Sequence, residues 1–374
     1  MTSLLLVPFP PAGHTEPMAA LAARLRQDGH TVTVFAESSL TRWGMRRPVS
    51  PGMCASADGA ALYRRMFFGD VADMTRDILD LARECEAELI VTDVLMPGGG
   101  LAAELAGLPW ASLSCSPLPV FDAYRAFIPE PAVACFGPRG VRESLGLPAD
   151  DDRNLLGRTS GRLHLIPATP RFAGFPELPA QAPLVGPFAV IPEERPGSPK
   201  RPPTGPPGVA VTFSSNAMAQ MTQVQDRYLN TVVEALTGLE VTGLVAHDAT
   251  GRAPGNVRFV GRTPHEALFD RCAAVVTQAG WGTVARAVLR GLPLVLVPFY
   301  GDQPYIAARC ADLGVGIALP AGTVTAAELR EAIRAVLEQP GYRKAAAELA
   351  AEFTAAAPLA TASSLITSRA WLRA

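Results

Sequence analysis

Short apolar runs alternate with helical patterns from the start of the chain. Residues 4–7 and 31–35 are continuous apolar or β-branched runs, which are typical of strands buried on both faces of a parallel sheet. Between them, residues 16–27 repeat apolar side chains at helical spacing, with Thr15 as a candidate N-cap and Gly29 as the expected end. The pattern therefore predicts a strand–helix–strand unit, with a loop before the helix.

The same alternation continues through the first half of the chain. The pattern predicts helices at residues 71–86 and 98–106, and strands at residues 89–92, 110–113 and 163–166. Strands that alternate with helices form parallel sheets, because right-handed crossovers carry each helix back over the sheet. We therefore expect an α/β domain.

A change in composition divides the chain. Residues 192–208 hold seven prolines and three glycines, so they can form neither a helix nor a central strand. After this run the alternation restarts, with strands expected at 209–213, 241–245, 257–260 and 294–297, helices at 220–236 and from Pro264, and mostly helix from 326 to 373. We expect two Rossmann-like, doubly wound domains: an N-terminal domain (1–190), a linker (191–208), a C-terminal domain (209–355), and a C-terminal helix (356–374) that packs back on the first domain.

Composition and charge exclude several classes of protein. The 374 residues are 48% hydrophobic and 18% charged, with a formal net charge of −2, which indicates no nucleic-acid or acidic-membrane partner. The six cysteines contain no Cys-x-x-Cys spacing, as in a reduced cytoplasmic protein. The start lacks the basic region of a signal peptide, and no apolar run reaches about 18 residues. A homodimer is compatible with these features.

The region around residues 273–303 carries the clearest candidate site. It is predicted to form a strand, a glycine-rich turn at residues 278–283, a helix and a second strand. Gly280, Gly282 and Thr283 open the helix, and a helix start offers unpaired N–H groups and the positive end of a dipole. We therefore expect a phosphorylated ligand at this turn.

Two residues at strand ends are candidates for acid–base chemistry. His14 follows the first strand and can act as a general base near neutral pH, although a loop histidine that caps the next helix is an alternative. Asp93 ends the strand 89–92, and a carboxylate on the far ring nitrogen of a histidine would orient it. Taken alone, Asp93 is equally compatible with an N-cap or a loop aspartate.

Further candidates are less specific. Asp302 and Gln303 follow the strand 294–297 and suit recognition of vicinal hydroxyls, whereas Asp302 is also a candidate N-cap. Gly280-x-Gly282-x-x-Ala285 matches a dinucleotide fingerprint, which leaves an NAD(P)- or FAD-dependent oxidoreductase as an alternative. Aromatic side chains of the first half can line an apolar acceptor pocket or pack in the core: Phe67, Phe68, Phe121 and Tyr124.

Taken together, these segments resemble the GT-B glycosyltransferases of the UDP-glycosyltransferase superfamily, in particular bacterial enzymes that glycosylate natural products. The motif G-H-x-x-P is present at residues 13–17, and the donor motif H-G-G-x-G-T-x-x-E…D-Q aligns without a gap from Gln278 to Gln303. The resemblance covers nearly the whole chain. It implies two domains facing across a cleft and an inverting transfer from a dTDP- or UDP-sugar to an aromatic or polyketide acceptor.

The resemblance also implies roles for individual residues. His14 matches the general base and Asp93 the residue that orients it. The donor would contact Gln278, Gly280, Gly282, Thr283, Asp302 and Gln303, together with Ser214, Ser215 and Asn216. N–H groups at Gly282 and Thr283 would hold the leaving phosphate. The nucleotide sugar is a co-substrate, so we expect no cofactor and no metal, and the sequence contains no metal-ligand motif.

Two positions depart from the family pattern. Gln278 stands where the family has a histidine that contacts the diphosphate, and Arg286 where it has a glutamate that contacts the ribose. An arginine has no acceptor atom for ribose hydroxyls. These changes leave open a non-catalytic sugar-nucleotide-binding protein as a further alternative, and O- and C-glycosylation are both compatible with the sequence.

Overall fold

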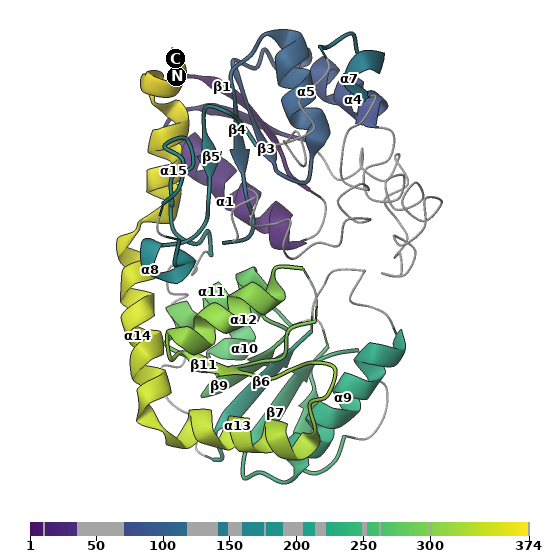
Figure 1. Cartoon of the computed structure of the whole chain (residues 1–374), viewed down its shortest axis with the longest axis vertical. Helices are drawn as coiled ribbons and strands as arrows, with labels where there is room; N and C mark the ends of the chain where they lie inside the picture. Colours follow the sequence, from purple (N-terminus) through teal and green to yellow (C-terminus); the bar gives the residue numbers. More distant parts are fainter. Residues whose placement is uncertain are drawn as a thin grey trace. The chain divides into compact units, whose positions relative to one another are not determined.

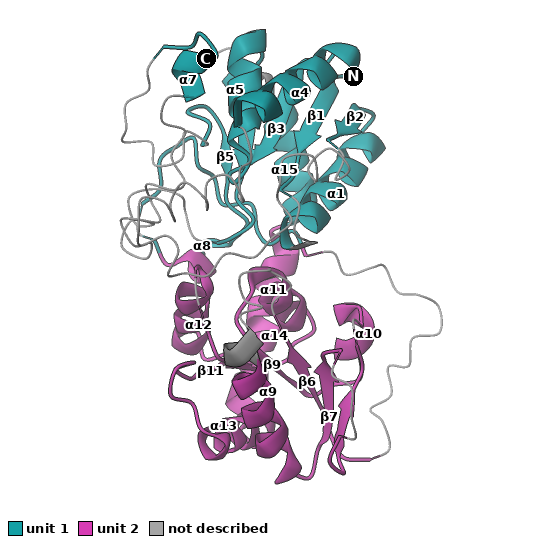
Figure 2. Ribbon diagram, turned by 90° about the vertical axis from the view of Figure 1, so that its right-hand side faces the viewer, with its two compact units in different colours: residues 1–170, 175–188, 357–374 teal, residues 171–174, 189–356 magenta. Residues whose placement is uncertain are grey.

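The computed structural model divides the chain into two compact units, which Figure 2 colours separately. Unit 1 comprises Met1–Pro170, Phe175–Phe188 and Ala357–Ala374, and unit 2 comprises Arg171–Gly174 and Ala189–Ala356. The structure describes residues 1–9, 12–35, 71–117, 141–148, 159–175, 177–189, 205–213, 222–248, 253–261, 263–299 and 301–372. Most of the predicted linker, from 191 to 204, lies outside these ranges.

Unit 1 is built on a parallel sheet with the strand order β2-β1-β3-β4-β5. Sequence order reverses between β1 and β3, which pair directly. Such a switch point is where ligands bind in open parallel sheets, beyond the carboxyl ends of the strands. The described strands are β1 (Ser3–Val7), β2 (Thr31–Val34), β3 (Leu89–Asp93), β4 (Trp110–Leu113) and β5 (His164–Leu165).

Helices cover both faces of the unit 1 sheet (Figure 1). Leu5 and Ile90 pack on one face against α4 (Val71–Glu84) and α5 (Pro97–Ala106), while Leu6 and Val91 pack on the other against α1 (Ala12–Gln27) and α15 (Pro358–Thr367). Because successive side chains of a strand alternate between faces, strands covered on both sides are apolar throughout. Two short helices, α7 (Val141–Ser144) and α16 (Arg369–Leu372), complete the described part of this unit.

Unit 2 contains a six-stranded parallel sheet in the order β11-β10-β9-β6-β7-β8. Numbered from its first strand this is the 6-5-4-1-2-3 order of a dinucleotide-binding fold, with its switch point between β6 and β9. The strands are β6 (Gly208–Thr212), β7 (Thr242–Ala246), β8 (Val257–Phe259), β9 (Ala274–Thr277), β10 (Leu294–Leu296) and β11 (Gly316–Ala318).

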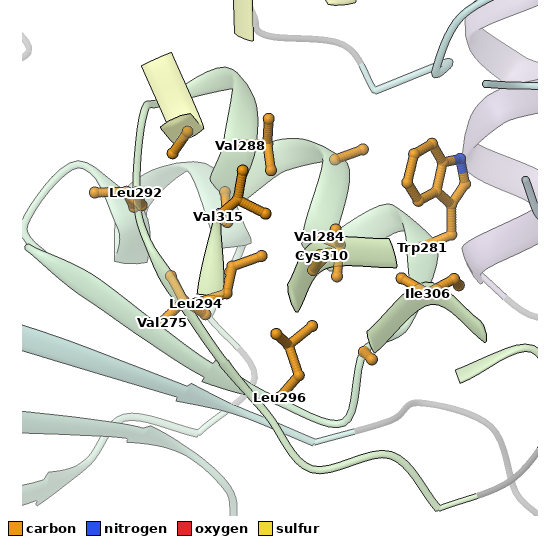
Figure 3. Close-up of a cluster of buried hydrophobic side chains, with 14 of the residues drawn as sticks. Val275, Trp281, Val284, Val288, Leu292, Leu294, Leu296, Ile306, Cys310 and Val315 are labelled. Carbon is orange, nitrogen blue, oxygen red and sulfur yellow. The ribbon is translucent and has the colours of Figure 1, made fainter. Parts of the chain in front are cut away.

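The core of unit 2 lies on both faces of this sheet. Val275, Leu294 and Leu296 face α11 and α12, as Figure 3 shows together with side chains of those helices. The opposite face packs against α9 and α13. The helices are α9 (Thr222–Thr237), α10 (His265–Phe269), α11 (Trp281–Leu289), α12 (Gln303–Asp312), α13 (Ala326–Glu338) and α14 (Pro340–Ala355).

A short segment from the N-terminal half belongs to unit 2. This segment, Arg171–Gly174, includes most of α8 (Pro170–Ala173). Phe172 packs on Trp281, with 4.7 Å between ring centroids, and both rings contact Phe353 near the end of α14. Arg309 on α12 donates to the backbone carbonyl of Phe172 at 2.9 Å. The buried aromatic cluster thus fixes this segment beside the start of α11.

The C-terminal segment belongs to unit 1. Helix α14 is part of unit 2, but the chain turns at Ala357, whose φ of 44° is in the left-handed region, and α15 packs on α1. Ser363 donates a hydrogen bond to Asp28 at 2.6 Å, and this bond lowers the pKa of the Asp28 carboxyl. The side chain of Ile366 is completely buried in the unit 1 core.

One stretch has the length and composition of a membrane-crossing helix. The most apolar window of residues 340–372 has a mean hydropathy of 1.3. From the sequence we expected no apolar run of about 18 residues. The stretch is three consecutive helices rather than one, α14, α15 and α16. Leu349 and Phe353 are buried in unit 2 and Ile366 in unit 1, so these three apolar side chains pack within the two units.

The structure corrects the sequence prediction at several element ends. Helix α1 begins at Ala12 rather than after Thr15, so Thr15 is not its N-cap, and His14 lies in its first turn rather than in a loop. Strand β11 was not predicted, because three residues flanked by Gly314 and Pro320 carry little periodicity. Gly29 and Gly107 end their helices as expected, with φ of 88° and 65°.

Candidate active site

His14, Asp93 and Cys115 come together at the carboxyl edge of the unit 1 sheet. His14 lies in the first turn of α1, which follows β1, Asp93 is the last residue of β3, and Cys115 follows β4 by two residues. These three strands are neighbours in the sheet, and β1 and β3 form its switch point. Parallel strands present their carboxyl ends at one edge, so residues 79 and 22 positions apart become neighbours.

The Asp93 carboxylate accepts hydrogen bonds on both of its oxygens. Its Oδ2 lies 2.8 Å from His14 Nδ1 and 2.9 Å from Cys115 Sγ, which donates to it. The Leu95 N–H donates to Oδ1 at 2.8 Å. The Asp93 side chain is fully buried, and a buried carboxylate requires such donors to offset the loss of hydration.

The contact with Asp93 sets the protonation pattern of the His14 ring. A carboxylate can only accept, so Nδ1 of His14 carries the proton and Nε2 of the neutral ring carries the lone pair. Phe9 meets the ring edge-to-face, with 5.1 Å between centroids. His14 retains 23% exposure, whereas Asp93 has none. The pair therefore presents an oriented imidazole with a buried carboxylate behind it, which is the geometry of a general base and its positioning residue.

The glycine turn follows β9 at the switch point of the unit 2 sheet. Ala279 is buried and adopts a left-handed backbone with φ of 64°, and Gly280 is the N-cap of α11 without a side-chain cap. A left-handed alanine is strained and persists only where the surrounding fold holds it, which occurs most often at functional turns. The donor motif has a glycine at this position, which suits the left-handed backbone, and this chain has an alanine there.

The first turn of α11 closes on the Gly280 carbonyl. The N–H groups of Thr283 and Val284 both donate to it, at 3.1 and 3.0 Å. The Thr283 N–H, expected to bind phosphate, is thus engaged within the turn. The N–H groups of Trp281 and Gly282 come earlier in the helix, where backbone donors point beyond its start. Phosphate binding by the N–H groups of Gly282 and Thr283 stays a prediction.

Arg286 lies one turn further along α11 and contacts Glu266 and the backbone of Gly282. Its Nε donates to Glu266 on α10 at 3.0 Å, and its Nη1 donates to the Gly282 carbonyl at 3.2 Å. A Cβ on residue 282 would lie only 3.0 Å from that Nη1, so a glycine leaves room for the guanidinium. Gln278 is 2% exposed and directly follows β9. Gln278 and Arg286, the two residues that depart from the family pattern, therefore lie at the start of the glycine turn and one helical turn after Gly282.

Asp302 and Gln303 follow β10 and begin α12. Asp302 occupies the N-cap position but makes no capping hydrogen bond, so the structure does not support a capping role for its side chain. Gln303 is buried, and its Oε1 accepts a hydrogen bond from the Phe299 N–H at 2.8 Å. Gln303 thus holds the loop after β10, which positions Asp302 beside it.

The remaining predicted site residues lie outside the residues that the structure describes. These are the donor-loop residues Ser214, Ser215 and Asn216, and the acceptor-pocket aromatics Phe67, Phe68, Phe121 and Tyr124. Their roles stay predictions.

Cys115 is a candidate that the sequence analysis missed. Together with His14 and Asp93 it forms a group whose nitrogen, oxygen and sulfur atoms all lie within 4.8 Å of one another. The sequence contains no metal-ligand spacing because these residues lie at or beyond the ends of three separate strands. The position of Cys115 just beyond a predicted strand, by the same rule that selected His14 and Asp93, was the available signal.

Comparisons with known proteins agree with this architecture. Residues 234–366 match the family model described as "Erythromycin biosynthesis protein CIII-like, C-terminal domain". The chain is 26% identical to 4'-demethylrebeccamycin synthase of Lentzea aerocolonigenes, over 94% of this chain and 96% of that protein. It is 28% identical to vancomycin aglycone glucosyltransferase of Amycolatopsis orientalis, over 90% of each.

A solved structure shows the same fold. The glycosyltransferase VinC in complex with dTDP superposes with a TM-score of 0.69 at 23% identity, over the full length of both chains. The similarity to VinC covers both units of this chain. Each unit has the parallel α/β architecture that the sequence predicted. The chain is therefore similar along nearly its whole length to bacterial natural-product glycosyltransferases, and it has the GT-B fold.

Proposed function

We propose that this enzyme transfers a sugar, with inversion, from a dTDP- or UDP-sugar to an aromatic or polyketide natural product. The observation that carries the proposal is the 2.8 Å contact between His14 Nδ1 and Asp93 Oδ2 at the switch point of unit 1. The relatives support the substrate classes: one is named for glucosylation of the vancomycin aglycone, and VinC was crystallised with dTDP.

In the proposed reaction His14 removes the acceptor proton. Nε2 accepts the proton of a hydroxyl or phenol while Asp93 stabilises the imidazolium that forms. The acceptor oxygen, or the ring carbon of an ionised phenol, attacks the anomeric carbon from the side opposite the phosphate. The bond to the nucleoside diphosphate breaks, and attack from that side inverts the configuration.

The donor half of the proposal rests on unit 2. The leaving diphosphate gains negative charge as the glycosidic bond breaks, and the start of α11 offers N–H donors and a positive dipole end. Asp302 would accept hydrogen bonds from sugar hydroxyls, because its carboxylate follows β10 at the start of α12, where the donor motif places it. Gln303 would act through the loop that it holds.

We propose that this reaction requires no cofactor and no metal, because base catalysis and a preorganised phosphate site supply its chemistry. An oxidoreductase is not favoured. The dinucleotide fingerprint belongs after the first strand of such a fold, whereas here it follows β9, the fourth strand of unit 2. The relatives named above are a 4'-demethylrebeccamycin synthase and a vancomycin aglycone glucosyltransferase. We propose that this protein is a cytoplasmic glycosyltransferase.

A ligand panel followed by a transfer assay tests the proposal. We expect dTDP or UDP to raise the Tm of the protein, and NAD(P) or FAD to leave it unchanged, because only a ligand that binds the folded state stabilises it. Incubation with dTDP- or UDP-sugars and aromatic polyketide aglycones should release the nucleoside diphosphate and form a glycoside. Stabilisation by dTDP and UDP without transfer to any acceptor would instead support a non-catalytic binding protein.

A further inference from the structure

We propose that His14, Asp93 and Cys115 form a binding site for a thiophilic divalent cation of the Zn²⁺ class, and that its occupation blocks turnover. The metal-binding part stands on geometry alone, and the inhibitory part rests on the proposed role of His14. Each residue offers one ligand atom, a ring nitrogen of His14, a carboxylate oxygen of Asp93 and Cys115 Sγ, and these atoms all lie within 4.8 Å of one another. The ring nitrogen assigned to the metal is Nδ1, because it already lies 2.8 Å from Asp93 Oδ2.

The present geometry needs only a small expansion to hold a metal. Oδ2 of Asp93 lies 2.8 Å from Nδ1 and 2.9 Å from Sγ, and a proton now occupies each of these two contacts. Tetrahedral zinc with bonds of about 2.0 Å to nitrogen and oxygen and about 2.3 Å to sulfur separates its ligand atoms by roughly 3.3–3.6 Å. The two contacts to Oδ2 therefore need to lengthen by only about 0.5–0.7 Å to reach these separations.

The ligand set selects the kind of cation. A thiolate and an imidazole favour Zn²⁺ and related ions over Mg²⁺ and Ca²⁺, which prefer oxygen ligands. Three protein ligands leave one position for water, as in open zinc sites. His14 is partly exposed and Asp93 and Cys115 are buried, so the cation enters past the imidazole.

The proton balance explains why occupation would stop the reaction. Cys115 loses its thiol proton to solvent on binding, because the thiolate is the ligand. The neutral His14 ring gives Nδ1 to the metal and so carries its proton on Nε2. That nitrogen is then a donor and no longer accepts a proton from an acceptor hydroxyl. The charge of the group changes from −1, with only Asp93 ionised, to zero with two anionic ligands and the divalent cation.

Cobalt titration of the full chain tests metal binding independently of activity. Co²⁺ bound to a thiolate gives a near-ultraviolet charge-transfer band, and we expect one equivalent to produce it in the wild-type protein and Zn²⁺ to abolish it. C115S should lack the band. Cys85→Ser is the matched control, because Cys85 is a partly buried thiol of the same unit whose Sγ donates to the Ala82 carbonyl, and it should keep the band.

Turnover provides the second readout. Zn²⁺ should inhibit the wild-type enzyme and Cys85→Ser equally, and inhibition of Cys115→Ser should need at least about tenfold more Zn²⁺, one ligand being lost. A charge-transfer band of equal strength in Cys115→Ser would overturn the proposed metal site. The absence of a band at one equivalent of Co²⁺ in the wild-type protein would also overturn it, and this second measurement does not depend on the variant folding. If the band forms and turnover persists, the metal site stands and His14 is not the base.

Discussion

Arg286 on α11 donates through Nε to Glu266 on α10, at 3.0 Å from the carboxylate oxygen. The pair is largely buried, with side chains 14% and 28% exposed, and a second pair, Arg290 with Asp270, repeats the contact one turn later at 2.9 Å. The arginine that replaces the family's glutamate therefore has a local structural partner. The positive charge of Arg286 is balanced by Glu266 within unit 2. Arg286 is therefore not an isolated cation.

The first prediction concerns this pair. Arg286→Glu should lower the Tm and give no gain in dTDP or UDP binding, because it places two carboxylates side by side and removes a pair worth about 1 kcal/mol. The exchange of both residues, Glu266→Arg with Arg286→Glu, should recover part of the lost stability. Thermal unfolding of the four proteins in a double-mutant cycle measures the coupling. Tighter nucleotide binding by Arg286→Glu alone would show that the arginine is a lost function and not an adaptation.

The second prediction concerns the His14–Asp93 pair. His14→Ala should reduce kcat at least about 100-fold while dTDP still raises the Tm as in the wild type. Asp93→Asn should also reduce kcat by at least about 100-fold, because an amide offers one oxygen and one NH₂ and cannot accept from both His14 and Leu95. Single-turnover measurements at saturating donor check both variants. Near-normal turnover in His14→Ala would remove it as the base.

The third prediction separates Asp302 from a structural role. Asp302→Ala should raise the KM for the sugar donor more than it weakens binding of the free nucleoside diphosphate, because the lost acceptor would bind sugar hydroxyls. The substitution removes no capping bond from α12. Thr325→Ala is a useful contrast: Thr325 forms a complete capping box with Glu328, so its loss should cost about 1 kcal/mol of unfolding free energy and leave the donor KM unchanged. Equal loss of sugar-donor and diphosphate binding in Asp302→Ala would contradict the assignment.

The fourth prediction is a pH dependence of stability. His164 on β5 is buried, with Nδ1 2.9 Å from Ser112 Oγ, and burial lowers its pKa from 6.5 to about 4. The unfolded chain binds the proton more readily, so stability is retained above pH 6.5 and falls as the pH drops toward 4, by up to about 3 kcal/mol. Below pH 4 this contribution stays constant.

Unfolding in denaturant between pH 7 and pH 4.5 measures this effect. His164→Asn keeps a polar group near Ser112 but cannot take up a proton in this range. Its free energy of unfolding should therefore depend less on pH than that of the wild type, even if it is lower at neutral pH. An unchanged pH dependence would assign the acid sensitivity to other groups.

Periodicity predicted most of the strands because both sheets are buried on both faces. Runs such as those of β3 and β9 are apolar throughout and end at a polar residue or a glycine turn, which locates the carboxyl edge of each sheet. The same rule selected His14 and Asp93 before their contact was known. The three-residue strand β11 is too short to show a period.

Other features depend on tertiary contacts that spacing does not encode. The first turn of α1 lacks a polar N-cap signal before Ala12, so its start was placed too late. Arg286 was interpreted from its alignment with a glutamate, and its partner Glu266 is 20 positions away on another helix. Cys115 belongs to the site only because β4 lies next to β3. In each case the missing information is which elements are neighbours in space.

The exchange of segments between the units has a consequence for protein engineering. A hybrid enzyme joined once, within the predicted linker, would take everything after the linker from the relative that supplies its donor half. Here such a join would also import a foreign α15, whose Ser363 and Ile366 must fit α1 and the core of unit 1. It would likewise leave Phe172 of the original chain facing a foreign Trp281 and Phe353. A functional hybrid therefore needs a second join near Ala357 and the Arg171–Gly174 segment from the same parent as the donor half.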